Sequence, residues 1–300
     1  MSAPGAGPAA AVHRPGIRPA RQEELPRLGG LYARAGFAPR LAGVAGFARA
    51  RLGGEVFVAD VDGELVGVAA GAHFGASGWV GGVAVAPERR RAGLGGALTE
   101  AVVAHLRDRR AATVLLLATE LGRGVYRRLG FAEEAEYLTL AGPPLPPGGA
   151  PPAHAPAGGG GGAVGRGVRG GRAGDRAAVG ALDRAATGED RGRLLDALWP
   201  AGGLLAGDKV VRGYHLANPW RGGGATVAAD PEAGLALLHA ARHATAGEVT
   251  LSLPAGNRAG VAGLAAAGFE ERARTTRMRL GPPLPWRLEA VFGAHNLFWG

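Results

Sequence analysis

Apolar residues in the first half of the chain alternate between strand-like runs and helix-like spacing. From Leu94 to Leu106 an apolar residue recurs at every fourth position, which predicts an amphipathic helix that starts near Gly93. Two apolar runs flank the turn Val61-Asp62-Gly63 and predict a β-hairpin. By the same criteria we expect strands at 17–20, 55–60, 64–74, 79–85 and 112–118, and helices at 21–36 and 123–129. This order of elements predicts a mixed α/β sheet.

A similar order of elements returns in the second half. The apolar pattern predicts helices at 176–186, 190–198, 231–244 and 258–266, and strands at 209–214, 225–229 and 248–253. Tyr126 precedes Gly130-Phe131 by the same offset at which Leu264 precedes Gly268-Phe269. The shared offset and the shared order predict that the two halves arose by an internal duplication.

Composition divides the chain into five parts. Residues 141–165 are rich in proline and glycine and have no periodicity, so we expect a flexible linker there. Residues 1–16 are expected to be disordered. A first domain at 17–140 and a second domain at 166–281 flank the linker. The remaining segment, 282–300, ends in Leu297-Phe298-Trp299-Gly300, which is too apolar for a free tail and is expected to dock on the body.

The charge of the chain is positive but evenly distributed. The formal net charge is +9, and Lys209 is the only lysine. Because arginines are spread along the whole chain, the composition does not indicate a nucleic-acid surface. The chain has no cysteine, which excludes thiolate metal sites, and no metal site is expected. Nothing resembles a signal peptide or a membrane span, so we expect a cytoplasmic protein without membrane contact.

The segment from Val83 to Gly96 carries the strongest chemical signal. A strand stops at Pro87, and a loop with arginines and glycines leads into the next helix. The first turn of a helix has backbone N–H groups without partners, so it suits a pyrophosphate. Gly93 and Gly95 would let phosphate oxygens approach these amides, and Arg90, alone or with Arg89 or Arg91, would add mobile positive charge. The candidate binding residues are Val83, Ala84, Val85, Arg90, Arg91, Ala92, Gly93, Leu94, Gly95 and Gly96.

Two motifs in the first half resemble those of the GNAT acyltransferase superfamily. Residues 85–95, V-A-P-E-R-R-R-A-G-L-G, resemble motif A, and residues 125–131, V-Y-R-R-L-G-F, resemble motif B. The resemblance covers about 17–140 and implies that the loop grips the pyrophosphate of acetyl-CoA. It also implies that strand 79–85 splays from its neighbour and that its backbone pairs with pantetheine. The family's common Asn before motif B is Thr119 here, which weakens a supporting contact.

The resemblance also implies a mechanism. A neutral amine attacks the thioester carbonyl, and a strand amide near Val83 or Ala84 stabilises the oxyanion. Tyr126 is the candidate general acid that protonates the leaving thiolate. Glu120 and His73 are the nearest candidates for a general base, but a solvated glutamate and an ordinary histidine explain both residues better.

The second half lacks the residues that would bind the cofactor. Its strand at 225–229 runs through Asp230-Pro231 into a helix, which predicts an ordinary N-cap, and Leu264 replaces the tyrosine. Asn257 keeps the family's Asn at a strand end. This half resembles the degenerate copy of tandem GNAT proteins, which would shape the acceptor pocket or an interface. Residues 187–191 match a capping box and predict a helix start. A set of aromatic residues either lines a pocket between the halves or forms core: Tyr214, Trp220, Phe292, Phe298 and Trp299.

The sequence therefore predicts two tandem GNAT-like α/β domains. The expected function is transfer of an acetyl group from acetyl-CoA to a primary amine of a small molecule or a peptide. The alternative is a module that senses acyl-CoA esters without turnover. The identity of the acceptor, the acyl-chain preference, the general base and the formation of a homodimer stay open.

Overall fold

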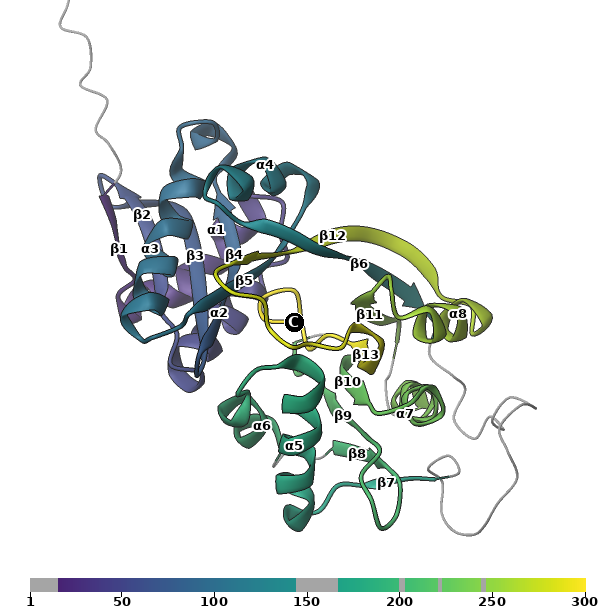
Figure 1. Ribbon diagram of the computed structural model, residues 1–300. Helices are drawn as coiled ribbons and strands as arrows, with labels where there is room; N and C mark the ends of the chain where they lie inside the picture. Colours follow the sequence, from purple (N-terminus) through teal and green to yellow (C-terminus); the bar gives the residue numbers. More distant parts are fainter. Residues whose placement is uncertain (1–15, 144–166, 200–202, 221–222, 244–246) are drawn as a thin grey trace, which may run out of the picture.

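The computed structural model describes residues 16–143, 167–199, 203–220, 223–243 and 247–300. Residues 1–15 of the segment 1–16 that was predicted to be disordered lie outside these ranges, as does the predicted linker from residue 144 onward, whereas Gly16 begins the first strand. The described chain forms two α/β halves, the first in purple to teal and the second in green to yellow (Figure 1).

The first half follows the predicted order of elements. Its hairpin forms as expected, because Asp62 and Gly63 adopt positive φ values of 52° and 83° in the turn. The expected helix at 21–36 divides into a short 3-10 segment, Gln22–Arg27, which contains Pro26, and an α-helix. The bounds of this half are β1 Gly16–Pro19, α1 Leu28–Arg34, α2 Leu41–Arg51, β2 Val56–Val61, β3 Glu64–Phe74, β4 Ser77–Val85, α3 Leu94–Asp108, β5 Thr113–Ala118, α4 Glu120–Arg128 and β6 Ala132–Gly142.

Helices cover both faces of the first sheet. The apolar stripe of α3 packs on β2, β3 and β4, and Leu98 and Val102 are fully buried. The contact is close, since a Cβ added at Gly71 in β3 would lie 2.9 Å from Cγ1 of Val102. Helices α1 and α2 pack on β3 and β4 as well, behind the sheet in the view of Figure 1. Helix α2 was not predicted, because its many alanines and glycines blur the apolar stripe.

The second half repeats the pattern with shorter strands. The expected strand at 209–214 was wrong, because the ladder begins only at Gly213, after a bend that follows Gly207. The bounds are β7 Val168–Gly170, α5 Arg176–Thr187, α6 Gly192–Leu198, β8 Gly203–Ala206, β9 Gly213–Ala217, β10 Gly224–Ala228, α7 Pro231–His243, β11 Val249–Pro254, α8 Arg258–Ala266, β12 Glu270–Leu280 and β13 Val291–Gly293.

The repeat seen in the sequence has a matching geometry. Helices α4 and α8 are each followed by a glycine with left-handed φ, +87° at Gly130 and +82° at Gly268. The Phe131 N–H donates to the Tyr126 carbonyl at 3.0 Å, and the Phe269 N–H donates to the Leu264 carbonyl at 3.0 Å. Both helices therefore end in the same way.

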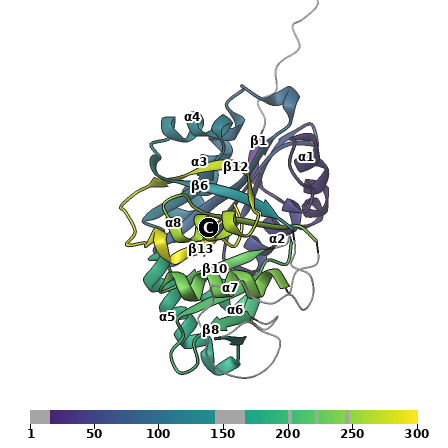
Figure 2. The ribbon, with the colours of Figure 1, turned by 90° about the vertical axis from the view of Figure 1, so that its right-hand side faces the viewer.

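The two halves exchange their long strands. One sheet has the order β1-β2-β3-β4-β5-β12-β6-β11, so β12 of the second half lies between β5 and β6 of the first. In return, β6 lies between β12 and β11. In both ribbon views β6 and β12 run side by side between the halves (Figures 1 and 2). The predicted linker at 141–165 was therefore wrong at its start, because Ala141 and Gly142 pair with β11 and β12.

Buried polar groups join the halves. Glu189 accepts hydrogen bonds from Ser77 Oγ at 2.6 Å and Trp79 Nε1 at 2.9 Å. Burial raises the pKa of Glu189, although Arg191 nearby opposes that shift. The predicted helix near 190–198 forms as α6 from Gly192, but the capping box predicted at 187–191 is absent, since Thr187 ends α5 and Gly188 follows as a left-handed C-cap. These residues form part of the contact between the halves.

The end of the chain docks as predicted. Phe298 and Trp299 are 4% and 0% exposed. A second sheet, β13-β10-β9-β8-β7, holds β13 from this segment. No described helix combines the length and the apolar character that crossing a bilayer requires.

Candidate functional site

The sheet of the first half opens between β4 and β5. These parallel strands pair only from Ser77–Thr113 to Trp79–Leu115, and no pairing continues among the described residues beyond Trp79. Beside the opening, β4 bulges against β3, and Gly82 takes a φ of +60°. The opening leaves one edge of β4 from Val80 to Val85 without a ladder partner on the β5 side, as the resemblance to the GNAT superfamily implies.

The loop after β4 presents an open helix N-terminus. Gly93 is the N-cap of α3 with φ +80°, and a Cβ built there meets nothing within 4 Å. Arg91 also has a left-handed φ of +66°, which is rare for a residue with a side chain. Alternation of left-handed and right-handed residues turns successive N–H groups toward one concavity that suits an anion. Arg91, Ala92 and Gly93 are all exposed.

Arg90 has a different role from the predicted one. Its Nε donates to the Val85 carbonyl at 3.2 Å, and its Nη2 donates to the Ala35 carbonyl at 2.7 Å. The side chain is therefore tied to the end of β4 and to the end of α1. The expectation of a mobile positive charge at Arg90 was wrong, because two backbone carbonyls hold the guanidinium.

The other predicted loop residues lie around this helix start. Leu94 is buried and anchors the first turn of α3 in the core. A Cβ at Gly95 would lie 4.0 Å from Val85, and a Cβ at Gly96 would lie 3.7 Å from Val125. Packing within the protein therefore does not require glycine at either position. A ligand that approaches the backbone closely would require it.

Tyr126 lies on α4, at the edge of the opening. Its ring packs edge-to-face on Phe131 with the centroids 6.0 Å apart, and the side chain is half-buried. Burial raises the pKa of Tyr126 to about 12. The hydroxyl therefore stays protonated over the whole physiological range.

The two candidate bases already have partners within the protein. Glu120 is exposed and pairs with Arg123 in the first turn of α4. His73 Nε2 lies 2.9 Å from the Arg109 carbonyl, near the turn between β3 and β4. The pKa of His73 is lowered, mainly by burial. Thr119 precedes α4 and makes no side-chain cap.

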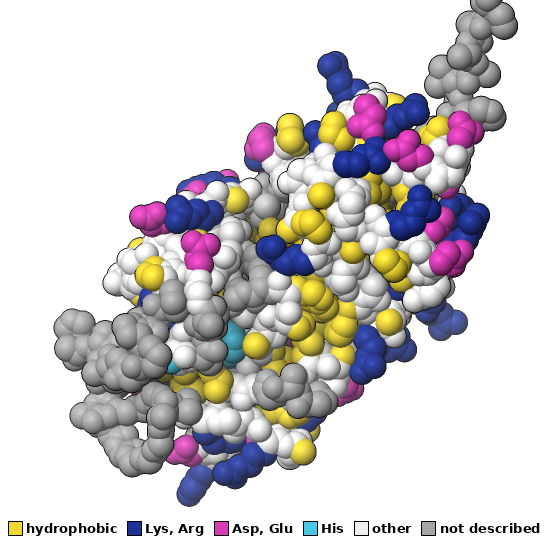
Figure 3. All heavy atoms as spheres, turned by 180° about the vertical axis from the view of Figure 1, so that it is seen from behind, with side chains coloured by type: hydrophobic (Ala, Val, Ile, Leu, Met, Phe, Trp, Pro, Cys, Tyr) yellow, Lys and Arg dark blue, Asp and Glu magenta, His cyan; other side chains and the backbone are white. Residues whose placement is uncertain are grey.

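A cavity of about 250 Å³ lies where the opening meets the second half. Tyr126, Gly82 and Val83 contribute to it from the first half. The second half contributes residues from the β9–β10 connection, from β12 and from the C-terminal segment. Seen from behind, hydrophobic side chains gather across the middle of the molecule, with arginines around them (Figure 3). The lining residues that the sequence did not indicate are Phe37, Ala38, Arg40, Leu41, Val44, Val80, Gly81, Gly82, Leu117, Asn218, Thr275, Asn296 and Leu297.

Two of the five aromatic candidates line this cavity. Trp220 and Phe298 do so, and a Cβ added at Gly81 would lie 2.6 Å from Cα of Phe298. Tyr214, Phe292 and Trp299 are fully buried instead and belong to the core. The sequence left these two outcomes open, because spacing does not show which side of an aromatic ring meets a cavity.

The corresponding opening in the second half is filled by the chain itself. Strand β13 pairs with β10 through Thr226–Gly293 and Val227–Val291. The next residue, Ala294, donates its N–H to the Ser252 carbonyl of β11 at 2.6 Å. Asn257 holds this segment, because its Nδ2 donates to the Val291 carbonyl at 2.9 Å.

The helix start in the second half is also closed. Asp230 Oδ1 accepts the Ala233 N–H at 3.0 Å, so a carboxylate from the chain caps α7 as predicted. Arg212 pairs with the same Asp230 and with Glu232. A phosphate at the N-terminus of α7 would therefore be repelled by the carboxylate of Asp230.

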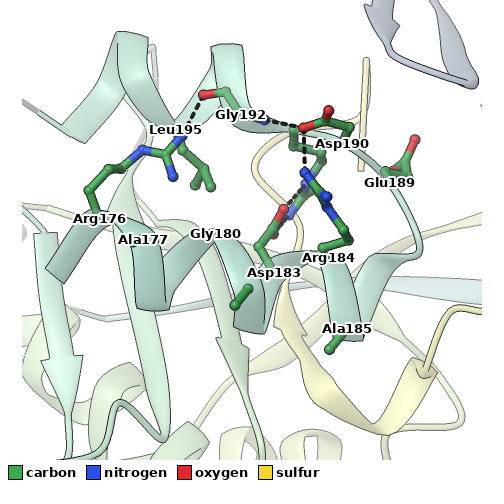
Figure 4. Close-up of a pocket in the computed structure, with 12 residues that line it drawn as sticks. Arg176, Ala177, Gly180, Asp183, Arg184, Ala185, Glu189, Asp190, Gly192 and Leu195 are labelled. Atoms are coloured by element: carbon green, nitrogen blue, oxygen red, sulfur yellow. Dashed lines mark hydrogen bonds and ion pairs between the residues drawn. The ribbon is translucent and has the colours of Figure 1, made fainter.

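A larger hollow of about 610 Å³ lies between α5 and α6, away from the strand opening. Arg176 Nη2 donates to the Gly192 carbonyl at 2.8 Å, and Arg184 pairs with Asp190 at 3.1 Å (Figure 4). The charged groups in this hollow satisfy one another. Among the described residues no cluster of His, Asp and Glu is suited to a metal ion.

Comparison with known proteins agrees with this geometry. Residues 53–133 and 179–293 each match a family model described as "Acetyltransferase (GNAT) domain". No curated relative matches the sequence. A putative acetyltransferase from Pyrococcus horikoshii is 19% identical, with 99% of each chain covered and a TM-score of 0.79. A tandem GNAT protein from the clavulanic acid biosynthesis pathway is 18% identical, with 90% of this chain and 99% of that chain covered and a TM-score of 0.59.

The two matches fall on the two halves that the structure shows, one on each side of the residues outside the described ranges. The structural neighbours share the arrangement of two such halves over nearly the whole chain. The chain therefore belongs to the GNAT acetyltransferase family and contains two GNAT domains in tandem.

Proposed function

We propose that the first half binds acetyl-CoA and that the protein transfers the acetyl group to a primary amine of a small molecule or a peptide. One observation carries the proposal. The opening between β4 and β5 runs from the exposed helix start at Gly93 to the cavity that holds Tyr126. Among the described residues of the second half, β13 fills the corresponding place.

The residues of the opening fit a long, charged thioester. The backbone from Arg91 to Gly96 would hold the pyrophosphate, since it includes the N-terminus of α3, is exposed from Arg91 to Gly93, and has no atom within 4 Å of a Cβ built at Gly93. The free edge of β4 at Val83 to Val85 would hold the pantetheine arm. Bound there, acetyl-CoA supplies an acetyl group that is activated as a thioester.

The residues near the cavity support direct attack by a neutral amine. A backbone N–H near Val83 or Ala84 would donate to the developing oxyanion, which is how fixed amides stabilise such charge. Tyr126 would donate a proton toward the leaving sulfur. Because its pKa is about 12 and that of a free thiol is about 8.5, complete proton transfer is uphill, and the hydroxyl acts chiefly as a hydrogen-bond donor.

In this proposal the second half forms one wall of the site that binds the acceptor amine. Trp220 and Thr275 line the cavity together with Tyr126, although they are separated from it in sequence by the residues between the halves. The strand exchange explains this placement, since β12 brings Thr275 beside β5 and β6.

A CoA-release assay over amines of different charge and shape tests the proposal. We expect release of CoA that depends on both acetyl-CoA and the amine, and mass spectrometry should locate one acetyl group on the amine nitrogen. Tight binding of acetyl-CoA in calorimetry without release by any amine would contradict the enzyme and support an acyl-CoA sensor.

A further inference from the structure

The cavity between the halves is lined by apolar and aromatic side chains and by no carboxylate. Leu41 and Val44 of α2 face Trp220 and Phe298 of the second half. None of the described lining residues is Asp or Glu. An acceptor with several ammonium groups would therefore lose hydration in this cavity without gaining a partner charge.

One cation stands at the rim of the cavity. Arg40 is exposed, lines the cavity, and makes no ion pair with any described residue. Arg34, six residues earlier, differs because it pairs with Glu64 and Glu88. A guanidinium that is free of internal partners can bind a carboxylate in a bidentate way.

Two buried polar groups of the lining also lack partners. Thr275 and Asn296 are 6% exposed each, and neither Oγ1 of Thr275 nor Nδ2 of Asn296 has a hydrogen-bond partner among the described residues. Asn296 is held in place, because its Oδ1 accepts the Phe298 N–H at 2.7 Å. Buried polar atoms without partners are rare in proteins, and a bound ligand or water commonly satisfies them.

We infer that the acceptor is an amine with an apolar or aromatic body and a carboxylate, and that Arg40 determines this specificity. The inference rests on the proposed function. The aromatic walls take the body, Arg40 pairs with the carboxylate at the rim, and the amine lies toward Tyr126. The reaction joins the amine nitrogen to the acetyl carbon and breaks the bond from that carbon to sulfur. The amine proton leaves to solvent, and the thiolate is protonated.

Two matched amines test the charge preference. 4-(Aminomethyl)benzoate and 4-(aminomethyl)benzamide have the same ring and a remote amine, and they differ in the carboxylate. We expect kcat/KM to be about fivefold to tenfold higher for the benzoate, as a partly exposed ion pair with hydrogen bonds predicts. Spermidine, a polycation, should be the poorest of the three acceptors.

Substitution of the rim arginine tests its role. Arg40→Gln should reduce the preference for the benzoate to about onefold to twofold and leave the KM for acetyl-CoA unchanged. Arg51→Gln is the matched control, since Arg51 is exposed at the other end of α2 and does not line the cavity. This control should keep the preference of the unmodified protein.

The outcomes separate the inference from the function beneath it. If CoA is released but spermidine is preferred, or if the ratio of benzoate to benzamide is the same in Arg40→Gln, the substrate class is wrong and the acetyltransferase stands. If calorimetry detects no acetyl-CoA binding and no amine releases CoA, the proposed function and the inference both fail.

Discussion

The two halves of this chain share their elements and differ in what lies between two strands. In the first half, β4 and β5 separate after Trp79, and the gap remains accessible. In the second half, β13 and Ala294 bridge β10 and β11. The comparison teaches that one segment entering the sheet is enough to close an opening between two strands, while the surrounding architecture stays the same.

The N-termini of α3 and α7 differ in the same way, because one leaves its backbone N–H groups accessible and the other is capped by a carboxylate. At α3, left-handed residues and an uncovered Gly93 leave the N–H groups accessible. At α7, the carboxylate of Asp230 already accepts a backbone N–H. One helix can therefore receive an external anion, and the other is satisfied by its own chain.

The largest effect on turnover is expected from substitution of Tyr126, which has Leu264 as its counterpart in the second half. Tyr126→Phe should lower kcat by about 10² to 10⁴ and leave the affinity for acetyl-CoA unchanged, because only the hydroxyl that donates toward the leaving sulfur is lost. Single-turnover acetylation and calorimetry measure the two quantities. Tyr137→Phe removes a hydroxyl from a fully buried tyrosine of β6 and should keep kcat. Equal turnover in Tyr126→Phe would exclude Tyr126 from the mechanism.

A pair of glycines tests the open helix start. Gly93 and Gly268 have φ values of +80° and +82°, and neither has an atom within 4 Å of an added Cβ. Substitution by alanine should therefore lower the free energy of unfolding by a similar amount at each position, roughly 1 to 2 kcal/mol. Only Gly93→Ala should raise the Kd of acetyl-CoA, by at least about tenfold, because its Cβ stands above the proposed phosphate site.

Calorimetry on the same proteins also counts the sites. We expect one acetyl-CoA per chain in the unmodified protein and in Gly268→Ala. Two sites per chain would show that the second half binds the cofactor despite β13. An equal loss of affinity in both alanine variants would show that backbone strain, and not the proposed phosphate site, explains the effect.

The wall that the second half contributes should give a smaller effect. Trp220→Ala removes an aromatic side chain of the cavity and should raise the KM of an aromatic amine on the order of tenfold. Trp220→Phe keeps an aromatic wall and should restore most of this loss. A thermal melt is needed beside the kinetics, since Trp220 also packs on Phe47 with centroids 5.0 Å apart. A raised KM for acetyl-CoA instead would contradict the assignment of this wall to the acceptor.

The smallest expected effect concerns the pH dependence of kcat/KM, which should not decrease toward pH 10. Since burial raises the pKa of Tyr126 to about 12, this hydroxyl stays protonated as the pH rises to 10. The amine must be neutral to attack, so kcat/KM should increase with pH up to the pKa of the amine and then level off. A pH profile from 6 to 10 measures this. A descending limb below pH 10 that disappears in Tyr126→Phe would show that the tyrosine ionises much earlier.

Much of the first half could be predicted from the sequence because its signals are local. The hairpin at Asp62-Gly63, the helix from Leu94 and the motif loop each depend on neighbours within a few residues. Helix α2 could not be predicted in this way, since its alanines and glycines carry little pattern. The mobility of the charge at Arg90 was misjudged for a different reason, because its partner Ala35 is 55 positions away along the chain.

The sequence by itself determined the family, the repeated order of elements and the absence of the motif from the second half. Periodicity, turn chemistry and two short motifs suffice for these, since each is written in adjacent residues. Only the tertiary structure decided that β12 and β6 change places between the halves, that β13 fills the second opening, and that Trp220 joins Tyr126 around one cavity. Those features depend on pairing and packing between residues more than 40 positions apart along the chain, which no local pattern specifies.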